Sequence, residues 1–387
     1  MFGIVSLLAD VVYEGARSIT GPLLASLGAS ALVVGVVTGA GEAAALVLRL
    51  VSGPLADRSG RFWELATAGY ALTVLTVPFL GVAGALGVAC ALVIAERAGK
   101  AIRSPAKDTL LSHATAATGR GRGFAVHEAL DQVGAVTGPL AVAGMLALTG
   151  DRYGPSLLVL ALPGLATLVL LVRLQRTVPN PAAYEPASDG AGAKPVPFSQ
   201  VGRVSALPRR FWVYAAFTAA TMSGFATFGV ISFHLVHRHV LGAAAVPLVY
   251  AGTMAAGGLA SLATGWWYDR SGPAVLTVLP VLAALVPVLA FTRQPAFAVL
   301  GALLWGAATG VQESTLRATV ADLVPSGRRA TAYGVFAAVV GGGAFVGGAL
   351  TGALYTVSVP ALLVTVAVIQ AGALVLLAAT RRRGADG

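Results

Sequence analysis

The chain has 387 residues, of which 57% are hydrophobic and only 11% are charged, and its formal net charge is +10. A soluble domain usually carries about 25% charged residues, so this chain lacks the polar side chains that would cover a surface in water. The composition excludes a soluble enzyme, a nucleic-acid-binding domain and a disordered chain, and it indicates an integral membrane protein. The single cysteine, Cys90, lies in an apolar run, which excludes an internal disulfide and a cysteine metal site.

Twelve apolar stretches along the chain are long enough to cross a membrane as helices. A spanning helix needs about 20 residues, and these runs lack the period-two alternation of membrane strands. The first stretch has no basic leader and contains Asp10, Glu14 and Arg17, so we expect a spanning helix there and no signal peptide. In chain order, the predicted spans are 3–27, 31–54, 63–84, 86–104, 123–148, 155–174, 211–236, 245–267, 274–292, 296–316, 331–356 and 358–380.

Basic residues are distributed unevenly between the two sides of this series. Of the 26 lysines and arginines, 19 fall in the connections after every second span and in the C-terminus, three fall on the other side, and four lie within spans. The positive-inside rule then places both termini in the cytoplasm. We therefore expect a multi-pass protein of the inner (cytoplasmic) membrane, whose partner is the lipid bilayer and not nucleic acid.

The two halves of the chain repeat each other. The segment Gly53-Pro-Leu-Ala-Asp57-Arg58-Ser-Gly60 recurs 212 positions later as Gly265-Trp-Trp-Tyr-Asp269-Arg270-Ser-Gly272. A parallel repeat of six helices is typical of transporters. A polar stretch rich in Pro, Ala, Gly and Ser separates the halves and indicates a flexible linker. We expect an N-terminal six-helix bundle over 1–174, a cytoplasmic linker over 175–208 and a C-terminal six-helix bundle over 209–387.

The repeated loop carries a resemblance to a known family. Gly53-x3-Asp57-Arg58-x-Gly60-Arg61 resembles the signature loop between helices two and three of the major facilitator superfamily, and the second copy lies where that family places it. The second copy departs at Pro273, where the basic residue is missing. The resemblance covers nearly the whole chain. It implies an all-α integral membrane fold of twelve helices in two pseudo-symmetric bundles, which works by alternating access.

Two further motifs resemble those of proton-driven exporters within the superfamily. Gly134-x3-Gly138-Pro139 resembles the antiporter signature of drug and metabolite exporters, although Val142 and Ala143 replace the paired glycines expected after it. Arg97 resembles the arginine of the fourth-helix motif, with Ala101 in place of the glycine that follows it.

The loop motif also has a physical interpretation. Gly53 and Gly60 allow a close helix approach and a tight turn, and Pro54 helps to end the span. Asp57 can accept hydrogen bonds from the free N–H groups that open another helix, which the resemblance implies is 331–356. Arg58 and Arg61 would pair with acids at neighbouring helix ends, for which Asp108 is the best candidate. We expect a conformational latch on the cytoplasmic side, made by Gly53, Asp57, Arg58, Gly60, Arg61, Asp108, Asp269 and Arg270.

Ionisable residues inside the predicted spans need a reason, because each costs about 2.5–3.5 kcal/mol at a helix centre. They gather in spans one, two, four and five, which the resemblance implies line the cavity of the first half. A carboxyl group there can carry a proton or form a static ion pair with an arginine. The candidates for proton coupling and for lining the cavity are Asp10, Glu14, Arg17, Glu42, Arg49, Arg97 and Asp131.

Other charged residues in these spans have two interpretations each. Glu96, Lys100 and Arg103 descend one face of span four, and Glu96 and Arg103 could each belong to a static buried ion pair. His127 lies four residues before Asp131, and it could relay protons or fill a packing position.

The second half presents a mostly apolar wall. Three histidines crowd the outer end of span seven without a nearby carboxylate, which predicts a polar cap and no metal site. Paired small residues, such as Gly35 and Gly39, predict close helix packing. The weak candidates for substrate contact are Phe225, Phe228, His234, Trp305, Gln312 and Glu313.

These features predict a secondary transporter and not an enzyme. The leading hypothesis is proton-coupled export, by antiport, of a small drug-like or metabolite solute. The alternative is proton-coupled uptake, by symport, of a polar or anionic solute, because Arg17, Arg49 and Arg97 could bind a carboxylate. The chain contains no phosphate-binding loop for ATP, and we expect no cofactor, with the proton gradient as the driving force. We expect a monomer, and the sequence does not identify the solute.

Overall fold

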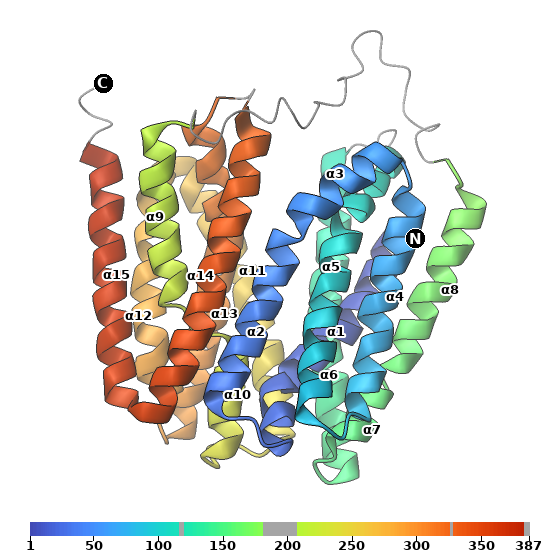
Figure 1. The fold of residues 1–387 in the computed structure, drawn as a ribbon, viewed down its shortest axis with the longest axis horizontal. Coiled ribbons are helices and arrows are strands. Elements are labelled where there is room, and N and C mark those ends of the chain that lie inside the picture. Colours follow the sequence, from blue (N-terminus) through green and yellow to red (C-terminus); the bar gives the residue numbers. More distant parts are fainter. Residues whose placement is uncertain (116–119, 181–206, 326–327, 383–387) are drawn as a thin grey trace. The chain divides into compact units, whose positions relative to one another are not determined.

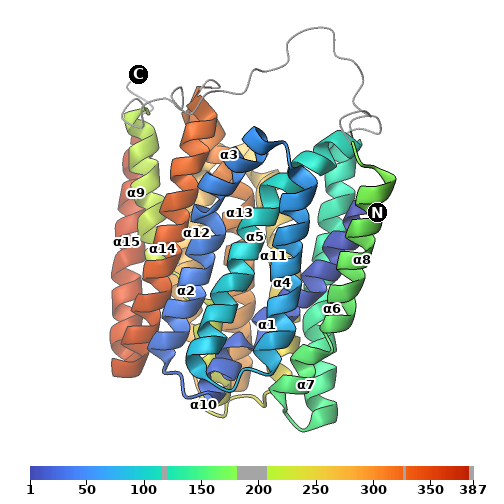
Figure 2. The same ribbon diagram turned by 45° about the vertical axis from the view of Figure 1, so that its right-hand side comes forward.

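The computed structural model describes residues 1–115, 120–180, 207–325 and 328–382. Every regular element in these ranges is a helix, as Figures 1 and 2 show. This confirms the predicted all-α membrane fold.

The helices of the N-terminal half follow the predicted spans closely. Two predicted spans are each divided into two helices, at Leu48 and at Val159–Leu160. The helices are α1 (Phe2–Ser26), α2 (Ala31–Val47), α3 (Arg49–Ser59), α4 (Phe62–Gly81), α5 (Leu86–Thr115), α6 (Arg120–Thr149), α7 (Tyr153–Leu158) and α8 (Ala161–Thr177).

The C-terminal half has the same plan. The predicted span 211–236 is interrupted after Ser223, and a short 3-10 helix opens the span 274–292. The elements are α9 (Arg209–Ser223), α10 (Phe228–His237), α11 (Ala245–Ser271), η4 (Gly272–Thr277), α12 (Val278–Ala290), α13 (Pro295–Leu323), α14 (Arg329–Val357) and α15 (Val359–Arg382).

Nine segments in the described ranges are long and apolar enough to cross a membrane. One of them, Ala245–Ala290, has 46 residues and turns at Gly272, so it corresponds to two predicted spans. The helices α1 and α5 are not among the nine, and both carry several charged residues. Ala245–Ala290 counts as two spans, and α1 and α5 add two more, so the described helices account for the twelve predicted spans.

The chain divides into two compact units, Met1–Arg17 with Ala44–Phe198 and Ser18–Ala43 with Ser199–Gly387. Residues 18–43 therefore group with the C-terminal half, because their glycines approach α14: a Cβ atom on Gly39 would lie 3.0 Å from the carbonyl oxygen of Ala344. The predicted bundles, 1–174 and 209–387, stay a prediction. Most of the predicted linker, residues 181–206, lies outside the described residues.

The first unit is held by an apolar core between α1, α4, α5 and α8. Trp63, Tyr70, Leu110 and Leu171 are buried in it, and the ring of Phe2 stacks on Trp63 with 5.6 Å between centroids. Burial of aromatic and aliphatic side chains of this size stabilises the packing of the four helices.

In the second unit, the predicted small-residue pairs lie at close helix contacts. A Cβ atom on Gly306 would meet the carbonyl oxygen of Thr253, and one on Gly310 would meet that of Gly257. Glycine therefore allows α13 to pack directly on the α11 backbone, as predicted.

Both copies of the loop motif end their helices at a glycine with a positive φ angle. Gly60 ends α3 at a φ of +64°, and Gly272 ends α11 at a φ of +59°, a backbone region that favours glycine. The predicted tight turn at Gly60 is thus confirmed. Two details differ from the prediction: Pro54 lies inside α3 and does not end it, and no described atom lies within 4 Å of a Cβ built on Gly53.

Candidate functional site

Two glycines bring α6 against α1. A Cβ atom on Gly134 or on Gly138 would meet backbone carbonyl oxygens of α1, so no larger residue fits this crossing. Asp131 lies just before Gly134 on α6, and a Cβ on Gly134 would lie 2.9 Å from the Cβ of Asp10 on α1. The antiporter-like motif therefore places two carboxyl groups at one helix crossing.

A third helix, α5, adds a buried arginine to this crossing. The Arg103 Nη2 atom lies 3.8 Å from Asp10 Oδ1. The guanidinium carbon lies 4.5 Å from the centre of the Tyr70 ring and 5.5 Å from that of Tyr13, a geometry in which aromatic faces attract cations. On α4, Gly69 lets the α5 backbone approach, since a Cβ there would lie 2.6 Å from the Arg103 nitrogen. Arg103 is thus held between an acid and two aromatic rings.

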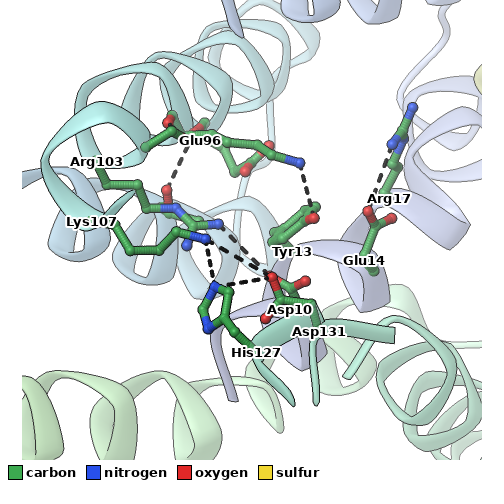
Figure 3. A network of polar contacts seen from close by, with 12 residues as sticks. Asp10, Tyr13, Glu14, Arg17, Glu96, Arg103, Lys107, His127 and Asp131 are labelled. Atoms are coloured by element: carbon green, nitrogen blue, oxygen red, sulfur yellow. Dashed lines mark hydrogen bonds and ion pairs between the residues drawn. The ribbon is translucent and has the colours of Figure 1, made fainter. Parts of the chain in front are cut away.

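One turn further along α5, Lys107 takes part in a triangle with His127 and Asp131 (Figure 3). The Lys107 Nζ atom lies 2.8 Å from His127 Nε2 and 3.9 Å from Asp131 Oδ2. The same His127 Nε2 atom lies 3.5 Å from Asp131 Oδ2. Lys107 Nζ also lies 3.6 Å from the more exposed Asp108. The triangle joins the C-terminal half of α5 to the N-terminal part of α6.

Several polar atoms of these residues are buried without a hydrogen-bond partner among the described residues. They are His127 Nδ1, Asp131 Oδ1, Arg103 Nε and Glu96 Oε1. Such groups are uncommon in proteins, because an unpaired buried polar atom is costly. Asp131 Oδ1 and His127 Nδ1 are therefore each open to a further hydrogen-bond partner.

Other charged residues surround this group. Arg17 lies 3.7 Å from Glu14 on α1, and Arg97 lies 3.1 Å from Glu96 on α5. Lys100 Nζ donates a hydrogen bond of 2.9 Å to the Tyr13 hydroxyl and lies 4.2 Å from the centre of its ring. Figure 3 shows the Arg17–Glu14 pair to the side of the Asp10 and Asp131 carboxyl groups.

The structure brings together only some of the predicted coupling residues. Asp10 and Asp131 share one site. Arg49 donates to Ser104, 3.3 Å away, at the start of α3, and Glu42 belongs to the second compact unit. Glu96 and Arg103 both lie in buried ion pairs, Glu96 with Arg97 and Arg103 with Asp10.

Several contributors to this site were not among the candidates for proton coupling: Tyr13, Arg103, Lys107 and His127. The predicted span 86–104 ends before Lys107 and leaves this residue in a connection. In the structure, α5 continues to Thr115 and includes it. The three-residue and four-residue spacing of Lys100, Arg103 and Lys107 was the signal that a single helix face continues past the predicted end.

The latch residues are exposed. Asp57, Arg58 and Arg61 lie at the end of α3 and just after it, and in the second copy the Arg270 guanidinium lies 3.4 Å from the centre of the Trp266 ring. The expected partner of Asp57 belongs to the other compact unit. The latch, including the pairing of Arg58 or Arg61 with Asp108, stays a prediction.

The aromatic candidates of the second half form a closed cluster. The rings of Phe228 and Tyr250 lie 4.5 Å apart, and that of Trp305 lies 5.4 Å from Phe228 and 6.2 Å from Phe225. Trp305 Nε1 donates a hydrogen bond of 2.8 Å to the carbonyl of Ala226. All of these rings are buried, so they act as core in this structure.

The remaining candidates of the second half differ in environment. His234 is buried, with one ring nitrogen 2.9 Å from the Tyr355 hydroxyl and the other 2.9 Å from the carbonyl oxygen of Thr292. Gln312 is half-buried and Glu313 is exposed on α13. No group of three or more potential metal ligands occurs within the described residues.

Comparison with known proteins gives a consistent result. A family model described as the Major Facilitator Superfamily matches residues 3–292. An uncharacterized protein of Mycobacterium tuberculosis (strain ATCC 25618 / H37Rv) is 64% identical over 383 residues, which cover 98% of this chain and 92% of that protein. An uncharacterized MFS-type transporter of Methanocaldococcus jannaschii is 25% identical over 354 residues, covering 88% and 84% of the two chains. The crystal structure of the nucleoside transporter NupG has the same fold, with a TM-score of 0.72, 15% identity, and coverage of 98% and 97%.

Proposed function

Because the chain belongs to the major facilitator superfamily, we propose that it exports a small organic solute, drug-like or metabolite, in exchange for protons. Family membership makes the chain a multi-pass membrane transporter and not an enzyme. Proton coupling, the direction of transport and the class of solute are the parts that we propose.

The observation that carries proton coupling is the position of His127 Nε2, between Lys107 and Asp131. A lysine ammonium only donates hydrogen bonds, so the ring nitrogen accepts from Lys107 only when it carries no proton. It donates to Asp131 only when it does carry one. Proton uptake by His127 therefore exchanges one contact for the other and places two positive charges 2.8 Å apart, which drives Lys107 away.

The two carboxyl groups extend this exchange to α1. Asp10 and Asp131 lie close enough to repel each other as carboxylates, and each is matched by its own cation, Arg103 or Lys107. A proton on Asp131 removes the repulsion and leaves Asp108 as the remaining acid beside Lys107. Proton binding thus changes the contacts among α1, α5 and α6, and this is how we propose that the proton gradient drives the conformational cycle.

Export by antiport is favoured over uptake by the glycine motif. The segment Gly134 to Pro139, which resembles the antiporter signature, is also the segment that brings Asp131 towards Asp10. We also propose that both termini lie in the cytoplasm and that the protein resides in the inner membrane, because the basic residues gather in the connections on that side.

The orientation is tested with a fusion to the C-terminus. Green fluorescent protein folds in the cytoplasm, whereas alkaline phosphatase becomes active only outside it. We expect fluorescence from the first fusion and no phosphatase activity from the second. The reverse pattern would overturn the orientation.

The coupling is tested in proteoliposomes with an imposed pH gradient and a panel of labelled solutes. We expect at least one solute to accumulate inside acidic vesicles, as antiport requires, and this accumulation to be lost in Asp131→Asn. The variant Glu128→Gln is the matched control, because Glu128 is an exposed acid on the same helix, and it should accumulate solute as the wild type does.

Two results would contradict the proposal. Accumulation inside alkaline vesicles would show symport, and would favour the uptake of a polar or anionic solute. Transport that equilibrates the solute and ignores the pH gradient would exclude both kinds of coupling.

A further inference from the structure

Lys100 is the cation of the charged network that has no matching acid. Four other cations of the network have a carboxylate within ion-pair distance: Arg17 has Glu14, Arg97 has Glu96, Arg103 has Asp10, and Lys107 has both Asp131 and Asp108. Lys100 has no carboxylate within ion-pair distance among the described residues, and its contact is with the hydroxyl and the ring of Tyr13. Asp10 and Glu14 act on it only from farther away.

An unmatched ammonium in this place needs a counter-charge. Lys100 lies halfway along α5, and Tyr13 lies halfway along α1, so the pair belongs to the middle of the protein. An unpaired charge at this depth is expensive. Lys100 is only half-buried, so part of its side chain can be reached by a solute.

The N–H and O–H groups that Lys100 and Tyr13 do not use on each other can bind an acidic group. Lys100 uses one N–H on Tyr13, which leaves two N–H groups, and the Tyr13 hydroxyl accepts that bond, which leaves its own O–H free to donate. The two donor atoms lie 2.9 Å apart, a separation that allows them to contact the two oxygens of one carboxylate. Hydrogen bonds between charged partners are about twice as strong as neutral ones.

We propose that Lys100 and Tyr13 bind a carboxylate of the transported solute, which makes small organic acids the substrate class. This inference rests on the proposed transport of a small solute, but it is independent of proton coupling. The three arginines that the sequence suggests for binding a carboxylate already have partners: Arg17 has Glu14, Arg97 has Glu96, and Arg49 has Ser104.

The test measures binding to the purified full-length protein in detergent, without a gradient. The probes are three acid and amide pairs of matched shape: benzoate and benzamide, nicotinate and nicotinamide, succinate and succinamide. Thermal unfolding is followed at constant ionic strength and pH, since a ligand that binds the folded state raises the Tm. We expect at least one acid to raise the Tm more than its amide does.

Variants assign this preference to the pair. In Lys100→Gln, the affinity for the acid should fall about tenfold to a hundredfold, the size expected for a lost charged hydrogen bond. Tyr13→Phe keeps the ring and should weaken the acid less. Lys100→Arg keeps the charge and should retain the preference, which shows that the site survives substitution. Arg173→Gln, at an exposed arginine of α8, is the control for removing a positive charge elsewhere and should behave as the wild type.

The inference is overturned if no acid stabilises the protein more than its amide, or if the preference for acids persists in Lys100→Gln. The outcome is separate from that of the coupling experiment. A protein that binds acids through Lys100 but ignores a pH gradient would retain this inference and lose the proposed antiport.

Discussion

At the scale of single residues, the charged groups form a matched set in which position along a helix decides the partner. Arg103 and Lys107 are one turn apart on α5, and they reach Asp10 on α1 and Asp131 on α6 respectively. Because each acid has its own cation, protonation of one acid changes one pair first. A single proton therefore weakens one ion pair first, and the contacts of the neighbouring ion pair change after it.

The sequence could identify the acids of this set better than their partners. Asp10 and Asp131 stood out because a carboxylate inside an apolar span is costly, and that cost does not depend on the fold. Their partners depend on which helices cross and at what height. Glu96 pairs with its neighbour Arg97, whereas Arg103, seven residues further along the same helix, turns towards Asp10. Pairing between helices could not be predicted from spacing within one helix.

At the scale of helices, glycine decides where the charged groups meet. The crossing of α1 and α6 depends on Gly134 and Gly138, because their missing side chains let backbone approach backbone. The sequence indicated these glycines as a motif, but the helix that they contact was not predictable from it. Their place beside Asp131 shows that one motif serves both packing and the position of an acid.

This packing gives a paired prediction on α6. Gly138→Ala places a methyl group against the α1 backbone and should destabilise the protein by about 1–3 kcal/mol, as overpacked sites do. Gly144→Ala is the matched control, because no described atom lies within 4 Å of its Cβ. Alanine there should be neutral or slightly stabilising, since glycine weakens a helix interior. Thermal unfolding of both variants in detergent measures the difference, and an equal Tm for the two would contradict this role of Gly138.

The aromatic candidates show the limit of composition as a guide. The sequence suggests three aromatic residues in predicted spans as substrate contacts: Phe225, Phe228 and Trp305. In the structure they pack on one another, with the Trp305 N–H bonded to a backbone carbonyl. A large buried ring fills space in a helix bundle as readily as it lines a cavity, and only the contacts distinguish the two.

At the scale of the whole molecule, the fold was predictable because the bilayer imposes it. Backbone groups in lipid must bond within their own segment, so apolar runs of sufficient length become helices. The predicted spans therefore agree with the helices, even where a span is divided near Leu48 or Ser223. The helix ends and the grouping of residues 18–43 with the second unit depend on side-chain packing, and they were not predicted.

The repeat connects the sequence to the whole molecule most directly. Gly60 and Gly272 occupy matching positions in the repeated sequence, and each ends its helix with a positive φ angle. Charge does not follow this symmetry, since the network of α1, α5 and α6 belongs to the first unit. We infer that the two halves share a scaffold and differ in chemistry, with proton handling and recognition of the acid in the first.

The most direct test of proton-driven export is the movement of protons when solute is added. Proteoliposomes without an imposed gradient are loaded with a pH-sensitive dye, and a solute that the protein transports is added outside. We predict that solute entry releases protons from the vesicles, raising the internal pH, and that Asp131→Asn and His127→Gln abolish this signal while Glu128→Gln retains it. Solute entry with no change in internal pH, or with acidification, would contradict antiport through this site.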